Sequence, residues 1–225
     1  MGICESRITN IFVSMKIKIH ALVLLFVLAI ISCNSKKDIK ATTESSENLQ
    51  SVKTNPYTNL DQSPMDMIYY PENYPILRMN HGDTVPLVAR VIYSRPHKKG
   101  RQIFGEGNAF LCPYGKIWRL GANEATEIQF FKNVSIAGTN IPAGDYVMYC
   151  IPHADRWTIV LNKNLYTWGL HVDETKDFFR TDVPVMEQTP PAEDFTMIFV
   201  DASGGAGLLM TWDNVKVVLP IMFLK

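Results

Sequence analysis

Residues 146–161 read YVMYCIPHADRWTIVL, and this stretch decides the fold class. Tyr146–Ile151 and Trp157–Leu161 are short apolar runs rich in aromatic and β-branched residues, which are typical of strands. The polar residues His153-Ala154-Asp155 between them form a turn signal. We therefore predict an antiparallel hairpin, with Trp157 facing the core because it alternates with two further apolar residues.

Similar strand patterns flank this hairpin on both sides. They are Thr84–Tyr93, Glu127–Phe130 and Val134–Ile136 before it, and Phe195–Val200, Leu208–Trp212 and Val215–Leu219 after it. Turns are predicted at Ala137-Gly138, Ser203-Gly204-Gly205 and Asp213-Asn214, and one short helix at Asp173–Phe179. About seven to nine short strands separated by such turns predict a single all-β domain, a β-sandwich or jelly roll.

The turn before the hairpin has a sequence of its own, Ile141-Pro142-Ala143-Gly144-Asp145-Tyr146. Proline presets the first angle of a type II turn, and Gly144 supplies the positive φ that this turn needs. We expect the ring of Tyr146 to face the core and its hydroxyl to bond the backbone across a sandwich corner. The predicted role of this tyrosine is structural.

The N-terminal 32 residues carry an export signal. Lys16 and Lys18 precede the apolar run Ala21–Ile31, which is shorter than the roughly 20 residues of a transmembrane helix. A start at Met15 gives a signal peptide of the usual compact form. The end of the run, Ile30-Ile31-Ser32-Cys33, resembles the bacterial lipobox, in which the cysteine takes a diacylglycerol and becomes the new N-terminus.

Two other interpretations of this region exist. The apolar run could act as an uncleaved anchor, or Met1–Ser6 could be a myristoylation signal with Cys4 palmitoylated. The second makes no use of the apolar run, so we favour lipidation of Cys33. The lipid bilayer is then a partner, and the protein is anchored in the cell membrane or outer membrane, facing the periplasm or the cell surface.

Residues 33–63 are polar and are predicted to form a disordered tether, because they offer little apolar surface to offset the entropy of ordering. Such a coil spans roughly 30 Å. Residues 64–225 form the all-β domain. The formal net charge is zero, with 22 basic and 22 acidic residues, so nucleic acid is not expected as a partner.

A long, ordered series of motifs runs through this domain. It comprises YSRP at 93–96, GR at 100–101, IFG at 103–105, PYGKIWRLGANEAT at 113–126, IPAG at 141–144, WTIVLN at 157–162 and WG at 168–169. The series resembles the bacterial domain of unknown function 2911 family over about Thr84–Ile221. The resemblance implies an exported or membrane-anchored protein without an assigned reaction, so it transfers no catalytic residue.

The chain departs from the family pattern at Cys112 and Cys150, where the family has apolar or small residues. Once Cys33 is lipidated and the residues before it are removed, these are the remaining cysteines. An even pair in an oxidising compartment suggests a disulfide, which would close a loop of about 38 residues and contribute about 3–4 kcal/mol. Two buried free thiols on strands that do not meet are the other interpretation.

The candidate site is the stretch from Tyr114 to Thr126, predicted to be a loop across one end of the sandwich. This stretch combines glycine, tryptophan, arginine and carboxylate residues in an order that lacks the alternation of a strand. Loops on a rigid scaffold often carry function. The candidate ligand-binding residues are Arg95, Arg101, Lys116, Arg119, Asn123, Glu124 and Trp168. Arginine forks suit carboxylate, phosphate or sulfate, so we predict a small anion, a glycan or an envelope protein as partner.

Three alternatives stay open. Arg119 could pair with Glu124 while Asn123 caps a turn, so that the motif encodes only a loop shape. The domain could instead be an envelope hydrolase with Glu124 and His97 as acid or base, although no nucleophile motif supports this. Trp168 could stack on a sugar. No metal or cofactor is expected, since the histidines lack ligand spacing, and we favour binding or assembly over catalysis.

Overall fold

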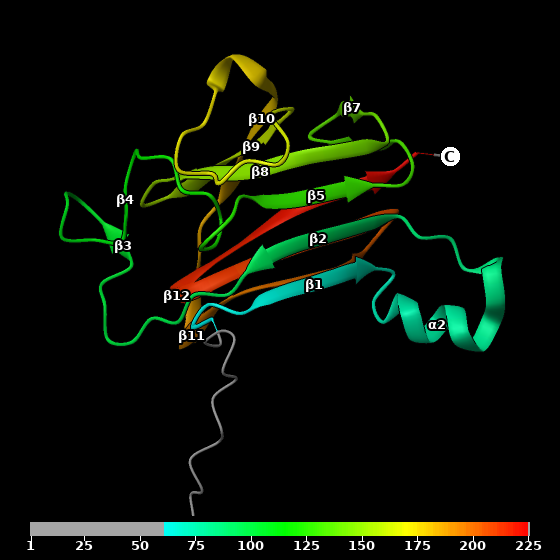
Figure 1. Cartoon of the computed structure of the whole chain (residues 1–225), viewed down its shortest axis with the longest axis horizontal. Helices are drawn as coiled ribbons and strands as arrows, with labels where there is room; N and C mark the ends of the chain where they lie inside the picture. Colours follow the sequence, from blue (N-terminus) through cyan, green and yellow to red (C-terminus); the bar gives the residue numbers. More distant parts are fainter. Residues whose placement is uncertain (1–60, 225) are drawn as a thin grey trace, which may run out of the picture. The chain divides into compact units, whose positions relative to one another are not determined.

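The computed structural model describes residues 61–224 (Figure 1). The predicted signal peptide and Cys33 lie outside these residues, and so does the predicted tether except for Asp61, Gln62 and Ser63. Across residues 61–224, no helix has both the length and the apolar composition needed to cross a membrane.

The larger sheet has six strands, each antiparallel to its neighbours. In spatial order they are β1 (Met65–Tyr70), β2 (Ala89–Ser94), β5 (Thr126–Phe130), β8 (Gly144–Pro152), β9 (Arg156–Asn162) and β10 (Asp177–Pro184). Strands β8 and β9 are the predicted hairpin, with Tyr149 opposite Val160. That prediction is confirmed, and Trp157 is fully buried as expected.

The smaller sheet has four strands and is dominated by one long hairpin. Its order is β11 (Met186–Ala202), β12 (Gly205–Phe223), β6 (Val134–Ile136) and β7 (Thr139–Ile141). Two short parallel strands, β3 (Phe104–Gly105) and β4 (Cys112–Pro113), lie apart from both sheets. The all-β, sandwich-like fold is the predicted class (Figure 1), but the twelve strands within residues 61–224 exceed the seven to nine expected.

Strand β12 explains one wrong prediction. Leu208, Met210 and Trp212 are buried in alternation, and after Asn214 the buried positions shift by one to Val215, Val217, Leu219 and Ile221. Asp213 has a φ of 54°, and the pairing with β11 is irregular near it. The predicted turn at Asp213-Asn214 is therefore a bulge that changes which residues face inward without reversing the chain.

The predicted helix at Asp173–Phe179 is also wrong. Only Glu174–Lys176 forms a 3-10 turn, which the Asp173 side chain caps by accepting from the Thr175 backbone N–H. Phe178 and Phe179 belong to β10, where Phe179 is buried and Phe178 packs against Tyr146 with ring centroids 5.5 Å apart. Pairing with β9 therefore overrides the local helical composition.

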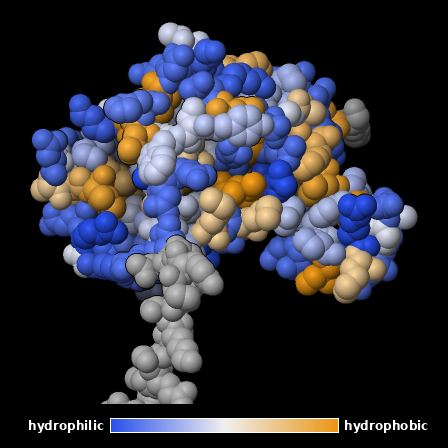
Figure 2. Space-filling model, in the orientation of Figure 1, coloured by the Kyte–Doolittle hydropathy of each residue, from blue (hydrophilic) through white to orange (hydrophobic). Residues whose placement is uncertain are grey.

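The region before β2 was incompletely predicted. Strand β1 and the helix α2 (Tyr74–His81) were missed. The strand expected from Thr84 begins at Ala89, since Gly82–Thr84 form a 3-10 turn and residues 85–88 belong to no helix or strand. Helix α2 lies to one side of the sheets and has no buried residue (Figure 1). Figure 2 shows apolar surface on it, where Ile76 and Met79 are exposed.

The turn before β8 has the predicted positive φ at Gly144 and the predicted Tyr146 contacts, although that φ differs from the roughly 80° of a type II turn. Gly144 has a φ of 143°, and the Tyr146 hydroxyl donates to the Pro142 carbonyl oxygen over 2.8 Å. The ring is buried, with the ammonium of Lys163 3.5 Å from its centroid. Tyr146 thus fixes the entry into β8, as expected of a structural corner residue.

Candidate functional site

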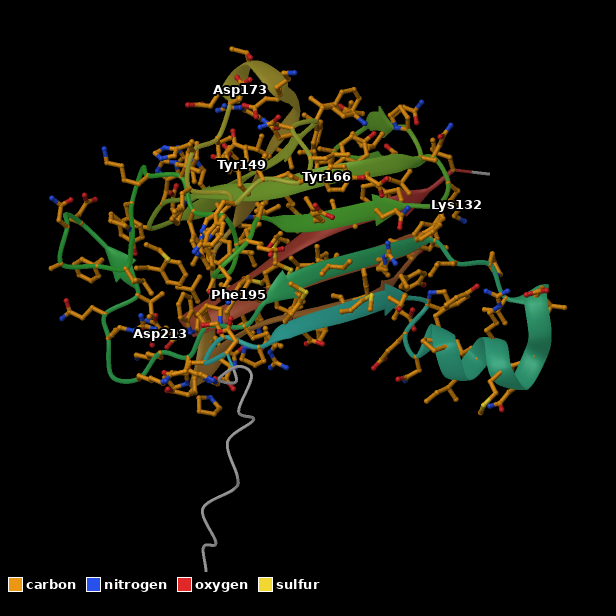
Figure 3. All side chains as sticks on the ribbon, in the orientation of Figure 1. Lys132, Tyr149, Tyr166, Asp173, Phe195 and Asp213 are labelled. Carbon is orange, nitrogen blue, oxygen red and sulfur yellow. The ribbon has the colours of Figure 1, made fainter. Side chains whose placement is uncertain are left out.

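A cluster of aromatic rings underlies one end of the sandwich. Phe104, Trp157, Phe195 and Trp212 surround the ring of Trp118, at centroid distances of 4.8 to 5.7 Å. The indole N–H of Trp118 donates to the Gly121 carbonyl, and its backbone bonds both ways with Cys150. The loop of residues 114–126 is thereby fixed to the sandwich. Figure 3 marks Phe195 and Asp213 at this end.

A second loop, residues 95–101, is fastened to β11 and β12. The Lys98 N–H donates to the Glu193 carbonyl over 2.7 Å, and the Lys98 ammonium pairs with Asp213 at 2.5 Å. His97 Nδ1 contacts the Asp194 carboxylate. The bulge in β12 thus supplies a carboxylate that positions this loop beside the first one.

The two loops and the segment after β9 enclose a hollow of about 410 Å³, here called the arginine pocket. It is lined by Ser63, Pro96, Arg101, Leu111, Cys112, Ile117, Trp118, Arg119, Gly121, Ala122, Gly169, Leu170 and Trp212. A smaller hollow shares Ser63 and Arg101 and adds His97 and Lys99. The arginine pocket therefore combines the basic side chains of Arg101 and Arg119 with apolar and aromatic side chains.

The two arginines of this pocket bond to backbone carbonyls. Arg119 Nη1 donates to the Asn123 oxygen over 2.5 Å and to the Trp168 oxygen over 2.9 Å, and Arg101 donates to Lys98 and His97 oxygens. Across residues 61–224 neither guanidinium pairs with a carboxylate. Partial burial lowers the pKa of Arg119, because the charged form loses hydration.

Four of the five other arginines within residues 61–224 differ, whereas Arg90 of β2 also has no carboxylate partner. Arg78, Arg95, Arg156 and Arg180 each form an ion pair with at least one carboxylate. The Arg95 guanidinium, predicted as a ligand contact, pairs with Asp66 of β1 and also donates to Thr196 of β11. It therefore holds two strands together and lies outside the arginine pocket.

A second hollow, of about 440 Å³, takes up two more of the predicted residues. This carboxylate groove is lined by Met65, Ile92, Tyr93, Ser94, Glu124, Ala125, Glu127, Tyr166, Thr167 and Trp168. The sequence pattern singled out Glu124 and Trp168 but missed Glu127 and Tyr166. The alternation of β5 indicates that Glu127 points outward, whereas no local signal marks Tyr166.

The remaining candidates have separate positions. Lys116 is exposed and lines neither hollow. Asn123 has a φ of 61°, and its amide donates to the Asp61 carboxylate over 2.5 Å. No ion pair joins Arg119 to Glu124, so the loop does not take the shape expected from that pairing. His97 and Glu124 line different hollows and are not brought together.

Cys112 and Cys150 are buried free thiols, and Cys112 also lines the arginine pocket. Burial raises the pKa of both thiols, and the nearby Cys112 adds to the effect on Cys150. Both are therefore protonated and poorly nucleophilic at neutral pH. The two thiols are not joined in this structure, and their oxidation to a disulfide stays a prediction. Across residues 61–224, no three His, Cys, Asp or Glu side chains cluster as metal ligands.

Comparison with known proteins gives one match. No curated protein and no solved structure matches the chain. A family model described as "Protein of unknown function (DUF2911)" matches residues 82–221, in agreement with the resemblance in the motifs. Because this match spans more than half of the chain, the protein belongs to the DUF2911 family.

Proposed function

We propose that the protein is a membrane-anchored lipoprotein of the bacterial cell envelope, and that its domain binds a small anion with an apolar body in the arginine pocket. The observation that carries the binding proposal is the pair Arg101 and Arg119. Across residues 61–224, these two guanidiniums line one pocket without a carboxylate partner. Of the five other arginines there, four have such a partner, and Arg90, which has none, lies in β2 and does not line the pocket.

The guanidinium of Arg119 has hydrogen-bond donors that are not used within residues 61–224. Only Nη1 bonds to the protein within residues 61–224, which leaves Nε and Nη2 for an acceptor. A planar fork of this kind fits a carboxylate or phosphate, and its partial burial strengthens the attraction. Leu111, Ile117 and Leu170 line the same pocket and would contact an apolar part of the ligand. An aryl carboxylate or an acidic sugar fits this combination.

The anchor proposal rests on the N-terminal sequence, with Cys33 following an apolar run. The predicted tether ends at the pocket, because Ser63 lines it and Asp61 accepts a hydrogen bond from Asn123. A ligand in the pocket would therefore lie next to the segment that leads to the lipid. We favour binding over hydrolysis because Glu124 and His97 line different hollows.

Ligand binding is tested by thermal unfolding of the full-length protein in detergent with inorganic phosphate, benzoate or glucuronate. A probe at about 100 times its Kd adds roughly 2.7 kcal/mol, which raises Tm by roughly 5–10 °C. Arg119→Gln and Arg101→Gln should weaken binding by roughly 10-fold or more, since hydrogen bonds to charged groups contribute roughly 1.5–3 kcal/mol.

The matched control is Arg156→Gln, which removes an exposed guanidinium that already pairs with Asp155 and Asp182. This variant should bind the probe like the parent. If no probe raises Tm, or if the control loses as much affinity as the pocket variants, the binding proposal is wrong. Titration calorimetry on folded variants separates lost affinity from lost stability.

The anchor is tested by labelling bacteria with an alkyne analogue of palmitate and detecting the label on the protein. The parent chain should carry the label and partition into the membrane fraction, and Cys33→Ala should lose both properties. Cys4→Ala is the matched control, because it removes the cysteine of the competing acylation pattern. Label that depends on Cys4 and not on Cys33 would overturn the proposed anchor.

A further inference from the structure

The carboxylate groove lies on the outward face of the larger sheet. Its floor includes Ile92 of β2 and Glu127 of β5, which are direct cross-strand neighbours. The core-facing residues of these strands, such as Val91 and Ile128, alternate with them and are fully buried. Figure 2 shows apolar surface over β1 and β2, where Met65 is 59% exposed.

Residues 166–168 form one wall of the groove, with exposed aromatic rings. Tyr166 is 87% exposed and Trp168 is 64% exposed. Neither ring packs against another aromatic ring within residues 61–224. Figure 3 shows Tyr166 over the larger sheet, consistent with its place in the lining. Large rings left in water beside a hollow are typical of ligand-contact surfaces.

Hydrogen bonds from backbone and side chains hold this wall in place. The Ala125 N–H donates to the Thr167 carbonyl over 3.3 Å, and Arg119 donates to the Trp168 carbonyl over 2.9 Å. At the start of the segment, Asn162 bonds to Asp173 and Asp177. The rings are therefore presented by a fastened segment, which reduces the entropy cost of ligand binding.

The groove has a negative charge that the protein does not neutralise. Glu124 and Glu127 have no ion pair and no side-chain hydrogen bond within residues 61–224, and the described lining contains no Lys, Arg or His. The nearby Arg95 is bound to Asp66 and Thr196. Two unpaired carboxylates beside apolar walls attract a cation and repel an anion.

We propose that the carboxylate groove binds an organic amine. The charged nitrogen would lie beside Glu124 and Glu127, donating to them where it carries N–H, and against the ring faces of Trp168 and Tyr166, which attract cations through their quadrupole. The carbon skeleton of the ligand would lie on Met65 and Ile92. This inference uses a different hollow and the opposite charge from the proposed anion site, so either can fail without the other.

Titration calorimetry on the full-length protein in detergent tests the proposal with three cations and their neutral counterparts. The pairs are cadaverine with 1,5-pentanediol, glucosamine with glucose, and choline with 3,3-dimethyl-1-butanol. At least one cation should bind with a Kd on the order of 0.1–1 mM, as expected for a small ligand in an open groove, and its neutral counterpart should bind at least 10-fold more weakly. The cation that binds best identifies a linear amine, an amino sugar or a quaternary ammonium.

Two variants locate the binding. Glu124→Gln with Glu127→Gln removes both charges and keeps the side-chain shapes, so affinity should fall at least 10-fold. Trp168→Ala should lower it about 3- to 10-fold, as expected for a lost cation–π contact. The matched control is Glu106→Gln, which removes an exposed carboxylate outside the groove and should bind as the parent does.

The results decide the proposal in every case. If no cation binds below 10 mM, if a neutral counterpart binds as well as its cation, or if the double variant keeps the parent affinity, the proposal is wrong. If the double variant does not fold, Glu124→Gln alone decides, because Glu124 is exposed and makes no bond within residues 61–224. Retained affinity there would also overturn the proposal.

Discussion

The arginine pocket and the carboxylate groove are built from neighbouring residues and differ in almost every other respect. Residues 166–168 line the groove, whereas Gly169 and Leu170 line the pocket. The pocket contains unpaired guanidiniums, and buried Trp118 and Trp212 line its floor. The groove contains unpaired carboxylates, and its aromatic rings are exposed. A change in the pocket floor therefore alters stability and binding together, whereas a change in the groove rim alters binding alone.

The largest expected effect compares two tryptophans. Trp118→Ala should lower the free energy of unfolding by about 3–5 kcal/mol, because it empties a buried site packed against four aromatic rings. Trp168→Ala should change it by less than about 0.5 kcal/mol, since the ring is largely in water. Urea unfolding followed by circular dichroism measures both.

Trp118→Phe is the control for the first change, because it keeps an aromatic ring and should recover part of the lost stability. If Trp168→Ala lowers the free energy of unfolding as much as Trp118→Ala does, the groove wall is part of the core and the comparison fails. If Trp118→Ala is tolerated, the pocket floor is not continuous with the core.

A medium effect is expected at Gly169, which separates the two hollows. Its φ is 77°, and a Cβ placed there would lie 3.0 Å from the Arg119 Cβ and 3.1 Å from the Ala125 Cα. Gly169→Ala should therefore lower the free energy of unfolding by about 2–4 kcal/mol, because alanine is strained in the left-handed backbone and its methyl group crowds its neighbours. Because Arg119 must move, benzoate binding should also weaken, as measured by calorimetry.

Gly107→Ala is the matched control for this substitution. Gly107 has a φ of 81°, and a Cβ added there would have no other atom within 4 Å beyond its chain neighbours. Gly107→Ala should lower the free energy of unfolding by about 1–2 kcal/mol through backbone strain alone and leave benzoate binding unchanged. Equal costs at the two glycines would show that segment 166–170 yields to the added methyl, and the two hollows would then be less tightly coupled than the contacts indicate.

The fold class was predictable because it depends on local patterns. Alternation and turn residues located β5, β6, β8 and β9 to within about two residues, and the motif series identified the family. Asp213-Asn214 was misread because a turn and a bulge use the same residue types. Only the pairing of β12 with β11 on both sides of the bulge distinguishes them.

The candidate site was predictable in its residue types but not in their grouping. A pairing of Arg119 with Glu124 was one of the alternatives that the motif left open, yet the two residues line different hollows. That separation depends on residues 166–170, which follow a different strand, and the motif WG at 168–169 does not show that they contact the loop of residues 114–126. Contacts between segments distant in sequence, such as Arg119 with the Trp168 carbonyl, decide which charges remain unpaired.

The smallest expected effect is also the sharpest test of the comparison. Asn123 lies between the two loop residues that separate into pocket and groove, and Asn123→Asp adds one negative charge there while tolerating the φ of 61°. The added charge should weaken benzoate binding in the arginine pocket and strengthen cadaverine binding in the carboxylate groove, each by roughly 2- to 5-fold, because solvent screens the interaction. Asn123→Gly also loses the bond to Asp61 but adds no charge, so both affinities should stay within about two-fold of the parent. Affinities that move in the same direction would mean that the two hollows do not differ in charge as the side chains indicate.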